Sequence, residues 1–511
     1  MLQGRTLWEL MEQRVDATPD ALLAVDEDMR TLTFAELWSE AERTAAGLMA
    51  AGVRAGDVVS WQLPTWIESL VLATGLNRLG AVQNPLLPIL REREVDIATE
   101  RTDARLLVVP SSWQGRDYES MATAVAERQH RGMRVLVADK ALPQGDPTQL
   151  PAPPRAIDAA DQAVRWVFYT SGTTADPRGV QHTDGTIAAA ARALVGRLAV
   201  IDADRAAVVF PITHIAGVVW LFAALQTGCG LILTETFDPA TAPEVLAREG
   251  VTLAGCGTVF HEAYLAEQRR SLHPLFPNVR AFPGGGAPKP AAIVEEVRAL
   301  FDVPVLSGYG LTEAPVLTMA DVADADADLA VSEGRPVPGV ELRIVGPDGA
   351  AVAPGGEGEI RARAPQMMLG YLDPLAELEA FDGDGWFCTG DLGRLDERGN
   401  LIVTGRLDDV IVRDGRNVSA REIEERLSTH PRVAEVAVIV VPDPDAGERV
   451  CAVVRTTDGA QDLTFDEMVD HLGSEGLEAW QLPDRLEIVA ALPRGHDGSV
   501  RKHVLRDEFK G

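Results

Sequence analysis

Two spacings of hydrophobic residues follow one another along the first half of the chain. Apolar residues three and four positions apart predict amphipathic helices over residues 6–17, Phe34–Ala51 and Trp66–Leu79. Between them lie short continuous apolar runs, which predict buried strands at Val58–Leu63, Leu106–Val109 and Val135–Val137. Further along, we expect an alanine-rich helix at Asp184–Leu198 and a strand at Val279–Phe282. Because strands and helices alternate in this way, we expect a layered α/β fold with largely parallel strands.

The long stretch Ala206–Thr234 carries no charged residue apart from His214 and is long enough to span a bilayer. Pro211 and the turn Gln226–Gly230 divide it into a strand, a helix and a strand. We therefore interpret it as buried core or pocket wall and predict no membrane insertion. The N-terminus is charged throughout and lacks the apolar centre of a signal peptide, so we expect a cytoplasmic protein.

Length and pattern both indicate more than one domain. A chain of 511 residues exceeds one ordinary core, and a small β-rich subdomain is expected near residues 334–360. The acidic run Asp321–Asp328 predicts a solvated loop. Beyond residue 407 the pattern changes to a short strand, a helix at Ala420–Leu427 and a long buried strand at Val433–Val441. We predict domains at 1–407 and 408–511, the second a smaller α+β domain.

The charge balance limits the classes of partner. A formal net charge of −30 repels nucleic acid and anionic lipid, so we predict neither as a partner. An anionic ligand such as ATP then requires a locally positive pocket. The four cysteines are widely scattered and show no metal-binding spacing, so we expect reduced thiols at Cys229, Cys256, Cys388 and Cys451.

The candidate chemistry centres on the stretch Trp166–Thr183. An apolar run ending at Tyr169 predicts a strand, and five small residues follow it: Thr170, Ser171, Gly172, Thr173 and Thr174. A loop of this composition can direct backbone N–H groups and hydroxyls at a polyphosphate, and the Arg178 guanidinium can pair with its oxygens. It lacks the spacing of a Walker A loop. A solvated connection is the alternative for such a cluster taken alone.

This stretch resembles the phosphate-binding signature of the adenylate-forming superfamily, which includes acyl-CoA synthetases and peptide-synthetase adenylation domains. Further motifs of that superfamily follow in order, so the resemblance covers nearly the whole chain: Gly284–Pro288, Ser307–Glu313, Trp386–Asp391 and Gly405–Asp409. It implies a large multi-layered N-terminal domain, with α/β subdomains and the small β-rich part. It also implies a smaller C-terminal domain that moves about a hinge near Asp408.

The resemblance assigns roles to individual residues. ATP would be held by the phosphate loop and Arg178, by the segments Gly285–Gly286–Ala287–Pro288 and Ser307–Gly308–Tyr309–Gly310, and by Thr312, Asp391 and Arg406. Tyr309 would stack on the base, Thr312 would bond the α-phosphate, and Asp391 would accept from the ribose hydroxyls. Glu313 would hold Mg²⁺, which prefers hard carboxylate oxygens. The acid-substrate pocket would be lined by His214, Ala216, Gly217, Cys256 and Gly284.

Two positions depart from the superfamily pattern. Arg178 stands where a lysine is usual, which keeps the charge and changes its reach. In the last motif, Leu492–Lys502, Ser499 occupies the position of the lysine that bridges the substrate carboxylate and the α-phosphate, and Gly495 replaces a threonine. Loss of a cation at that point is expected to slow adenylation. Arg501 or Lys502 could fill the gap, but we expect both to be exposed tail charges.

The favoured hypothesis is an AMP-forming acid–thiol ligase. It would activate a small acid, cyclic or aromatic by resemblance of the N-terminal half, with ATP and Mg²⁺, and transfer the acyl group to coenzyme A. A second hypothesis replaces the acid by nitrite and diazotises an aryl amine, because Ser499 leaves room for altered chemistry. A third is a nucleotide-binding homologue with weak catalysis. A homodimer is also considered.

Overall fold

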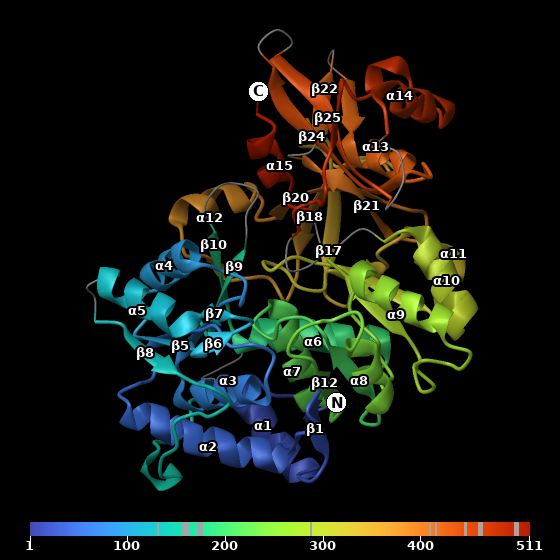
Figure 1. Ribbon diagram of the computed structural model, residues 1–511. Helices are drawn as coiled ribbons and strands as arrows, with labels where there is room; N and C mark the ends of the chain where they lie inside the picture. Colours follow the sequence, from blue (N-terminus) through green and yellow to red (C-terminus); the bar gives the residue numbers. More distant parts are fainter. Residues whose placement is uncertain are drawn as a thin grey trace. The chain divides into compact units, whose positions relative to one another are not determined.

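The computed structural model describes residues 1–129, 132–155, 163–170, 177–286, 289–407, 410–413, 416–443, 447–457, 463–494 and 500–510. The chain forms two compact units (Figure 1). The first comprises Met1–Glu341 and Arg363–Gly385, and the second comprises Leu342–Ala362 and Trp386–Gly511. Asp408, the predicted hinge, lies outside the described residues, and the boundary between 407 and 408 stays a prediction.

A seven-stranded sheet forms one half of the first unit, in the order β19-β10-β9-β4-β3-β5-β8. Its five parallel strands are β9 (Trp166–Thr170), β4 (Val82–Pro85), β3 (Val58–Trp61), β5 (Leu106–Val109) and β8 (Arg134–Val137). At one end of the sheet, β10 (Arg178–His182) pairs antiparallel with β9, and the edge strand β19 (Gly370–Tyr371) pairs antiparallel with β10. The predicted strands and their largely parallel order are confirmed.

Two four-stranded sheets make up the other half, with orders β11-β12-β1-β2 and β13-β14-β15-β16. Leu253 joins them, because it forms parallel bridges to Ala206 in β11 and to Ala281, which precedes β13. The bounds of these strands are β11 Arg205–Val208, β12 Gly230–Leu233, β1 Leu22–Asp26, β2 Thr31–Thr33, β13 Phe282–Gly285, β14 Val305–Tyr309, β15 Thr318–Met319 and β16 Arg335–Pro336. The strand predicted at 279–282 lies three residues further on and includes the glycines.

The helices of the first unit follow the predicted apolar spacing. The helices α1 (Leu7–Ala17), α2 (Phe34–Ala50), α3 (Ile67–Leu79) and α6 (Asp184–Leu198) begin and end close to the predicted residues. Thr33 caps α2, and Glu36 completes the capping box. The stretch Ala206–Thr234 folds as β11, α7 (Ile215–Thr227) and β12, and almost all of its apolar residues are buried. Among the described residues, no helix has both the length and the hydropathy needed to cross a bilayer.

The remaining helices of the first unit connect the strands: α4 (Glu92–Arg101), α5 (Tyr118–Gln129), α8 (Ala242–Arg248), α9 (Thr258–Arg270), α10 (Ala291–Phe301), α11 (Asp326–Val331) and α12 (Pro374–Ala380). The prediction of a loop over Asp321–Asp328 is wrong for residues 326–328, which are helical. Helix α11 begins at Asp326, because Leu329 is buried and anchors one turn against the core. Acidic residues in its first turn also suit the helix dipole.

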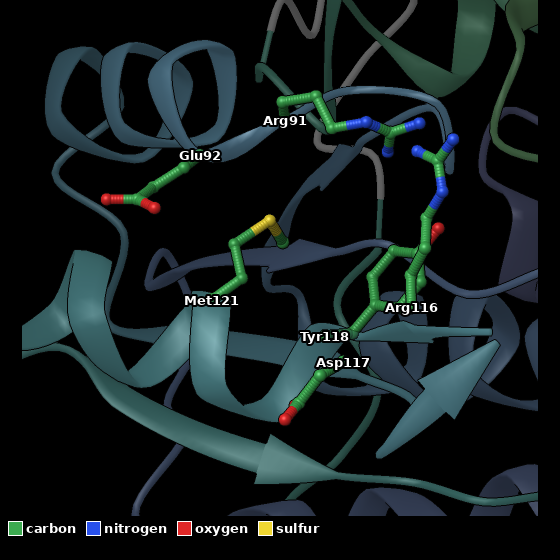
Figure 2. Close-up of a pocket in the computed structure, with 6 residues that line it drawn as sticks. All are labelled: Arg91, Glu92, Arg116, Asp117, Tyr118 and Met121. Carbon is green, nitrogen blue, oxygen red and sulfur yellow. The ribbon is translucent and has the colours of Figure 1, made fainter.

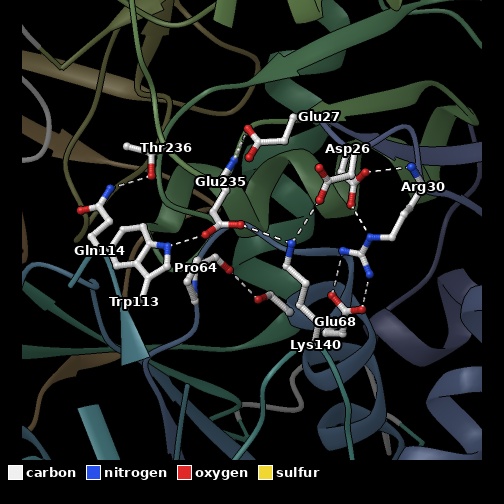
Figure 3. Close-up of polar contacts among 12 residues, drawn as sticks. Asp26, Glu27, Arg30, Pro64, Glu68, Trp113, Gln114, Lys140, Glu235 and Thr236 are labelled. Atoms are coloured by element: carbon white, nitrogen blue, oxygen red, sulfur yellow. Dashed lines mark hydrogen bonds and ion pairs between the residues drawn. The ribbon is translucent and has the colours of Figure 1, made fainter. Parts of the chain in front are cut away.

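A polar network links the short hairpin of β6 (Ser112–Trp113) and β7 (Arg116–Asp117) to the segment after β12 (Figure 3). The Trp113 indole donates to Glu235 Oε1 at 2.6 Å, and Gln114 donates to Thr236 at 2.8 Å. Lys140 lies 3.5 Å from the other oxygen of Glu235. The network therefore fixes the hairpin, which follows β5 of the large sheet, to the neighbouring sheet.

The described part of the second unit contains two sheets of three or more strands and a two-stranded hairpin. One has the order β17-β18-β20-β21, over Glu341–Val345, Gly358–Arg363, Phe387–Leu395 and Leu401–Arg406. The other contains β24 (Val433–Asp443), β25 (Gly447–Thr456) and β26 (Arg485–Ile488). Alternate residues of β24 enter two different apolar clusters, one shared with α13 (Ala420–Leu427) and α14 (Phe465–Ser474) and the other with α15 (Lys502–Glu508). Strands β22 (Val410–Arg413) and β23 (Arg416–Ser419) form a separate hairpin.

Candidate functional site

The predicted phosphate loop connects the two strands of a hairpin. Strands β9 and β10 pair antiparallel, and Thr170 lies opposite Arg178 at the neck. Ser171, Gly172, Thr173 and Thr174 lie outside the described residues. Tyr169 donates to Ala98 O of α4 at 3.3 Å, and Arg101 of α4 donates to Pro177 O at 3.0 Å, so this helix supports the neck. Thr170 and Arg178 therefore occupy adjacent positions where the loop begins and ends.

The predicted metal ligand Glu313 lies close to this hairpin. Its side chain is 8 % exposed, and its Oε1 accepts a 2.6 Å hydrogen bond from the hydroxyl of Tyr371 in β19. The Cζ atom of Arg178 lies 5.6 Å from the centre of the Tyr371 ring. One tyrosine thus contacts both the predicted phosphate-binding arginine and the predicted metal-binding carboxylate.

His182 holds the backbone of the same motif. Its Nε2 lies 2.8 Å from the carbonyl oxygen of Thr312, and its Nδ1 lies 2.9 Å from Thr186 Oγ1. The ring is fully buried, and burial lowers the pKa of His182 from 6.5 to about 4. Because the carbonyl can only accept, we assign the proton of the neutral imidazole to Nε2.

Two predicted nucleotide segments meet at one edge of a sheet. Strands β13 and β14 run parallel, with Gly284 opposite Ser307 and Gly285 opposite Gly308. A Cβ on Gly285 would lie 2.7 Å from Gly308 O, so glycine is required for this approach. Tyr309 and Gly310 follow directly at the carboxyl end of β14, where open α/β sheets place ligands. Ala287 and Pro288 lie outside the described residues.

The residues predicted to line the acid pocket come from several segments of the first unit. His214 caps α7 by accepting from Ala216 N at 3.2 Å, and both residues are partly exposed. Cys256 follows the bridging residue Leu253, and Gly284 belongs to the next strand. Gly217 differs from these because it is buried, and a Cβ there would lie 2.6 Å from Ile212 O. Its visible role is to let α7 pack on the preceding turn.

In the second unit, Asp391 and Arg406 form a pair. They lie opposite each other in β20 and β21, and Arg406 Nε donates to Asp391 Oδ1 at 2.9 Å. Asp391 N donates to Thr389 Oγ1 at 3.1 Å, which holds the turn of the T-G-D motif. The carboxylate is largely buried, whereas about half of the Arg406 side chain is accessible. Both predicted ribose contacts therefore share one strand pair.

The last motif is only partly described. Ser499 and Gly495 lie outside the described residues. Lys502 is not an exposed tail charge as predicted, because its ammonium forms a 2.8 Å ion pair with Glu424 and its side chain is 18 % exposed. Arg501 is exposed, as expected. The sequence contains three further lysines, Lys140, Lys289 and Lys510, and the first two of them are engaged within the first unit.

A surface cavity of about 500 Å³ lies beside the N-terminus of α4 (Figure 2). The guanidinium groups of Arg91 and Arg116 face each other across it, and Tyr118 closes its base by donating to Pro88 O at 2.7 Å. Glu92, Asp117 and Met121 complete the lining. The cavity follows the carboxyl ends of β4 and β5, whereas the predicted phosphate loop follows β9 of the same sheet.

The residues present fit Mg²⁺ bound together with a nucleotide. Among the described residues, no group of three or more metal-ligating side chains occurs. Mg²⁺ with a nucleotide needs no such cage, since it is bound by one or two carboxylates, substrate phosphates and several waters. The largely buried and oriented carboxylate of Glu313 provides one such ligand.

Sequence reasoning missed four residues of the first unit. His182 and Tyr371 contact predicted site residues through strand pairing, and Arg91 with Arg116 forms a cavity that no motif indicated. A local signal was present for His182, because this residue ends the strand that directly follows the phosphate loop. No local signal marked Tyr371, which lies 58 positions from its partner Glu313.

The fold and these motifs define an AMP-binding enzyme, and the chain belongs to that family. The model of the AMP-binding enzyme family matches residues 11–372, and that of the AMP-binding enzyme C-terminal domain matches residues 422–498. The predicted superfamily and the α/β fold with a smaller C-terminal domain are therefore confirmed. The resemblance to acyl-CoA synthetases holds over both parts of the chain.

Individual relatives align over nearly the whole chain. The medium-chain fatty-acid–CoA ligase of Escherichia coli is 28% identical over 99% of this chain and 90% of its own length. The salicyl-AMP ligase / salicyl-S-ArCP synthetase of Mycobacterium tuberculosis is 31% identical over 98% and 90%. The structure of o-succinylbenzoate CoA synthetase from Bacillus subtilis with its acyl-adenylate has a TM-score of 0.84, at 27% identity over 100% of this chain and 99% of that chain. ATP-bound MatB from Rhodopseudomonas palustris has a TM-score of 0.87, at 29% identity over 99% of both chains.

Proposed function

We propose that this chain is an AMP-forming acid–thiol ligase that activates a small carboxylic acid with ATP and transfers the acyl group to coenzyme A. The observation that carries the proposal is the convergence of Arg178, Tyr371 and Glu313 beside the neck of the phosphate hairpin. This convergence supplies a cation for phosphate oxygens next to a carboxylate for their metal. The family match and the names of the relatives support the same reaction.

In the first half-reaction a carboxylate oxygen of the acid attacks the α-phosphorus of ATP, and pyrophosphate leaves. Mg²⁺, when bound, neutralises charge on the phosphates. Arg178 pairs with phosphate oxygens, Glu313 holds the metal, and Thr312 orients the α-phosphate. Asp391 and Arg406 are proposed contacts to the ribose, and Tyr309 to the base. In the second half-reaction the thiol sulfur attacks the acyl carbon, AMP leaves, and the thiol proton passes to solvent.

We propose a cyclic or aromatic acid as the substrate. Residues 210–234 contain no carboxylate, so an amino-acid substrate would find no partner there for its ammonium group. The aromatic rings of Phe237 and Phe260 stack edge to face at 4.7 Å, and Phe260 lies on α9 just after Cys256. The salicyl-AMP ligase and o-succinylbenzoate CoA synthetase are named for aromatic acids, which supports a ring-shaped substrate, whereas other relatives are named for fatty acids.

We further propose that the Arg91–Arg116 cavity binds phosphate groups of the acceptor. The chain carries a net charge of −30, and the cavity is lined by the carboxylates of Glu92 and Asp117 as well. The two guanidiniums that point toward each other provide the donors for an anionic group. Coenzyme A carries phosphates distant from its thiol. Arg116→Ala is expected to raise the KM for coenzyme A about tenfold and to leave pyrophosphate release without coenzyme A unchanged. An unchanged KM for coenzyme A would remove this assignment.

The reaction is tested by pyrophosphate release over a panel of cyclic, aromatic and aliphatic acids, each with and without coenzyme A. We expect release with at least one ring acid and formation of the matching thioester. Release only with nitrite and an aminoarene would favour the diazotase alternative instead. Calorimetric ATP binding without release from any acid would favour the weakly catalytic homologue.

Ser499→Lys tests the departure in the last motif. If the serine slows adenylation, the introduced lysine supplies a cation at the α-phosphate, and the rate of acyl-adenylate formation rises by tenfold or more. If the site is not needed for this acid, the rate stays unchanged. Lys502→Ala is the matched control, because that lysine is paired with Glu424 and its loss is expected to act on the stability of the second unit.

A further inference from the structure

We propose that Tyr371 is a positioning residue for the metal-binding carboxylate, setting Glu313 relative to Arg178; this inference rests on the proposed function. Tyr371 is 8 % exposed, and its hydroxyl donates to Glu313 Oε1 at 2.6 Å. Its ring lies beneath the guanidinium of Arg178, with 5.6 Å between Cζ and the ring centre. A single side chain therefore contacts both the carboxylate and the cation.

The phenol hydroxyl is the donor of this bond, because an ionised carboxylate oxygen only accepts. A protonated phenol next to a carboxylate makes a charge-assisted hydrogen bond, which is stronger than a neutral one. The bond restricts rotation of the Glu313 carboxylate and thereby orients the oxygens that would face a metal.

The backbone of Tyr371 is held on both sides. Tyr371 pairs with Val180 of β10. Its carbonyl accepts from Gln181 Nε2 at 3.0 Å, and its N–H donates to Glu377 at 2.8 Å. Arg178 lies two residues before Val180 on the same face of the strand. The distance from the ring to Arg178 is therefore set by sheet register.

The backbone of Glu313 is held independently of the tyrosine hydroxyl. Its carbonyl accepts from Met368 N at 2.7 Å, and the preceding carbonyl of Thr312 accepts from His182 at 2.8 Å. Removing the hydroxyl alone should therefore leave the main chain in place and delete one hydrogen bond of the carboxylate. This separation makes a positioning role distinguishable from a structural one.

The test is Tyr371→Phe, which keeps the ring under Arg178 and deletes the hydrogen bond. We expect the affinity for Mn²⁺, measured by electron paramagnetic resonance with a non-cleavable ATP analogue, to fall about tenfold. Affinity for the analogue without metal should change less than twofold. Tyr264→Phe is the matched control, because it deletes a buried hydrogen bond from α9 to Gly255 O and should leave Mn²⁺ affinity unchanged.

A second variant excludes an effect of general damage. In a Glu313→Gln background, Tyr371→Phe should cause no further loss of Mn²⁺ affinity, since the two side chains act as one unit. Equal Mn²⁺ affinity of wild type and Tyr371→Phe would overturn the inference, as would full additivity in the double variant. The Mn²⁺ affinity is measured without turnover. If the chain releases no pyrophosphate with any acid, the proposed function is refuted, but the effect of Tyr371→Phe on Mn²⁺ affinity can still be measured. Absence of Mn²⁺ binding in the wild type would overturn both.

Discussion

The buried imidazole of His182 should make the first unit sensitive to acid, and the effect can be calculated. The pKa of His182 is lowered from 6.5 to about 4 by burial. Because the folded pKa lies below the unfolded one, the unfolded chain takes up a proton first as pH falls. Stability is therefore lost below about pH 6.5, and the loss is complete below about pH 4. At about 1.36 kcal/mol per pKa unit, the full loss is about 3 kcal/mol, of which about 2 kcal/mol is reached at pH 5.

The perturbation is His182→Gln, whose amide can still donate to the Thr312 carbonyl but does not titrate. Urea unfolding at a series of pH values, followed by tryptophan fluorescence, reports mainly on the first unit, which contains most of the tryptophans. We expect the variant to lose about 2 kcal/mol less than wild type between about pH 7.5 and pH 5. Some acid sensitivity should remain, because burial also lowers the pKa of His261 to about 4.

The matched control is His273→Gln, which replaces an exposed histidine and should leave the pH dependence of stability unchanged. The reasoning is refuted if wild type and His182→Gln lose stability in parallel over this range. A variant that is less stable by the same amount at every pH would show only a packing defect. Parallel loss of stability would mean that folding does not lower the pKa of His182.

Three further changes have calculable consequences. Asp184→Ala should lower the free energy of unfolding by about 3 kcal/mol in urea titrations, because the buried carboxylate accepts from three side-chain and backbone donors that would be left unpaired; an effect below 1 kcal/mol would contradict this. Gly217→Ala should lower the thermal midpoint, at a cost of about 1–3 kcal/mol, because its Cβ would meet Ile212 O at 2.6 Å; an unchanged midpoint would show that the turn yields freely. Arg178→Ala should raise the KM for ATP about tenfold or more, and Arg178→Lys should return the KM most of the way to the wild-type value. Equal KM values for wild type and both variants would exclude a phosphate contact.

Much of the fold was predictable because its elements are locally specified. The spacing of apolar residues predicted α1, α2, α3 and α6 with nearly correct ends, and the apolar runs predicted β3, β5 and β8. The stretch Ala206–Thr234 was resolved correctly by a proline and a glycine-containing turn. The errors fell where local signals compete. At Asp326–Val331 acidic composition indicated a loop, but burial of Leu329 stabilises a helix.

The residues of the candidate site were predicted motif by motif. The structure brings some of these residues together, whereas others lie outside the described residues. Thr170, Arg178, Thr312 and Glu313 belong to one region of the first unit, as the hydrogen bonds and ring contact of His182 and Tyr371 demonstrate. Ser171–Thr174, Ala287, Pro288 and Ser499 lie outside the described residues, and their roles stay predictions. Gly217 was predicted to line a pocket, and its buried contact with Ile212 gives it a packing role.

The sequence by itself determined the family, the succession of helices and strands, and the residue types available for phosphate, metal and ribose. Tertiary structure alone decided which of these residues act together. The pairing of β10 with β19 places Tyr371 opposite Val180, and only that register puts one phenol between Arg178 and Glu313. The physical reason is that a motif reflects neighbouring residues along the chain, whereas strand pairing joins segments whose contact depends on the packing of the whole unit.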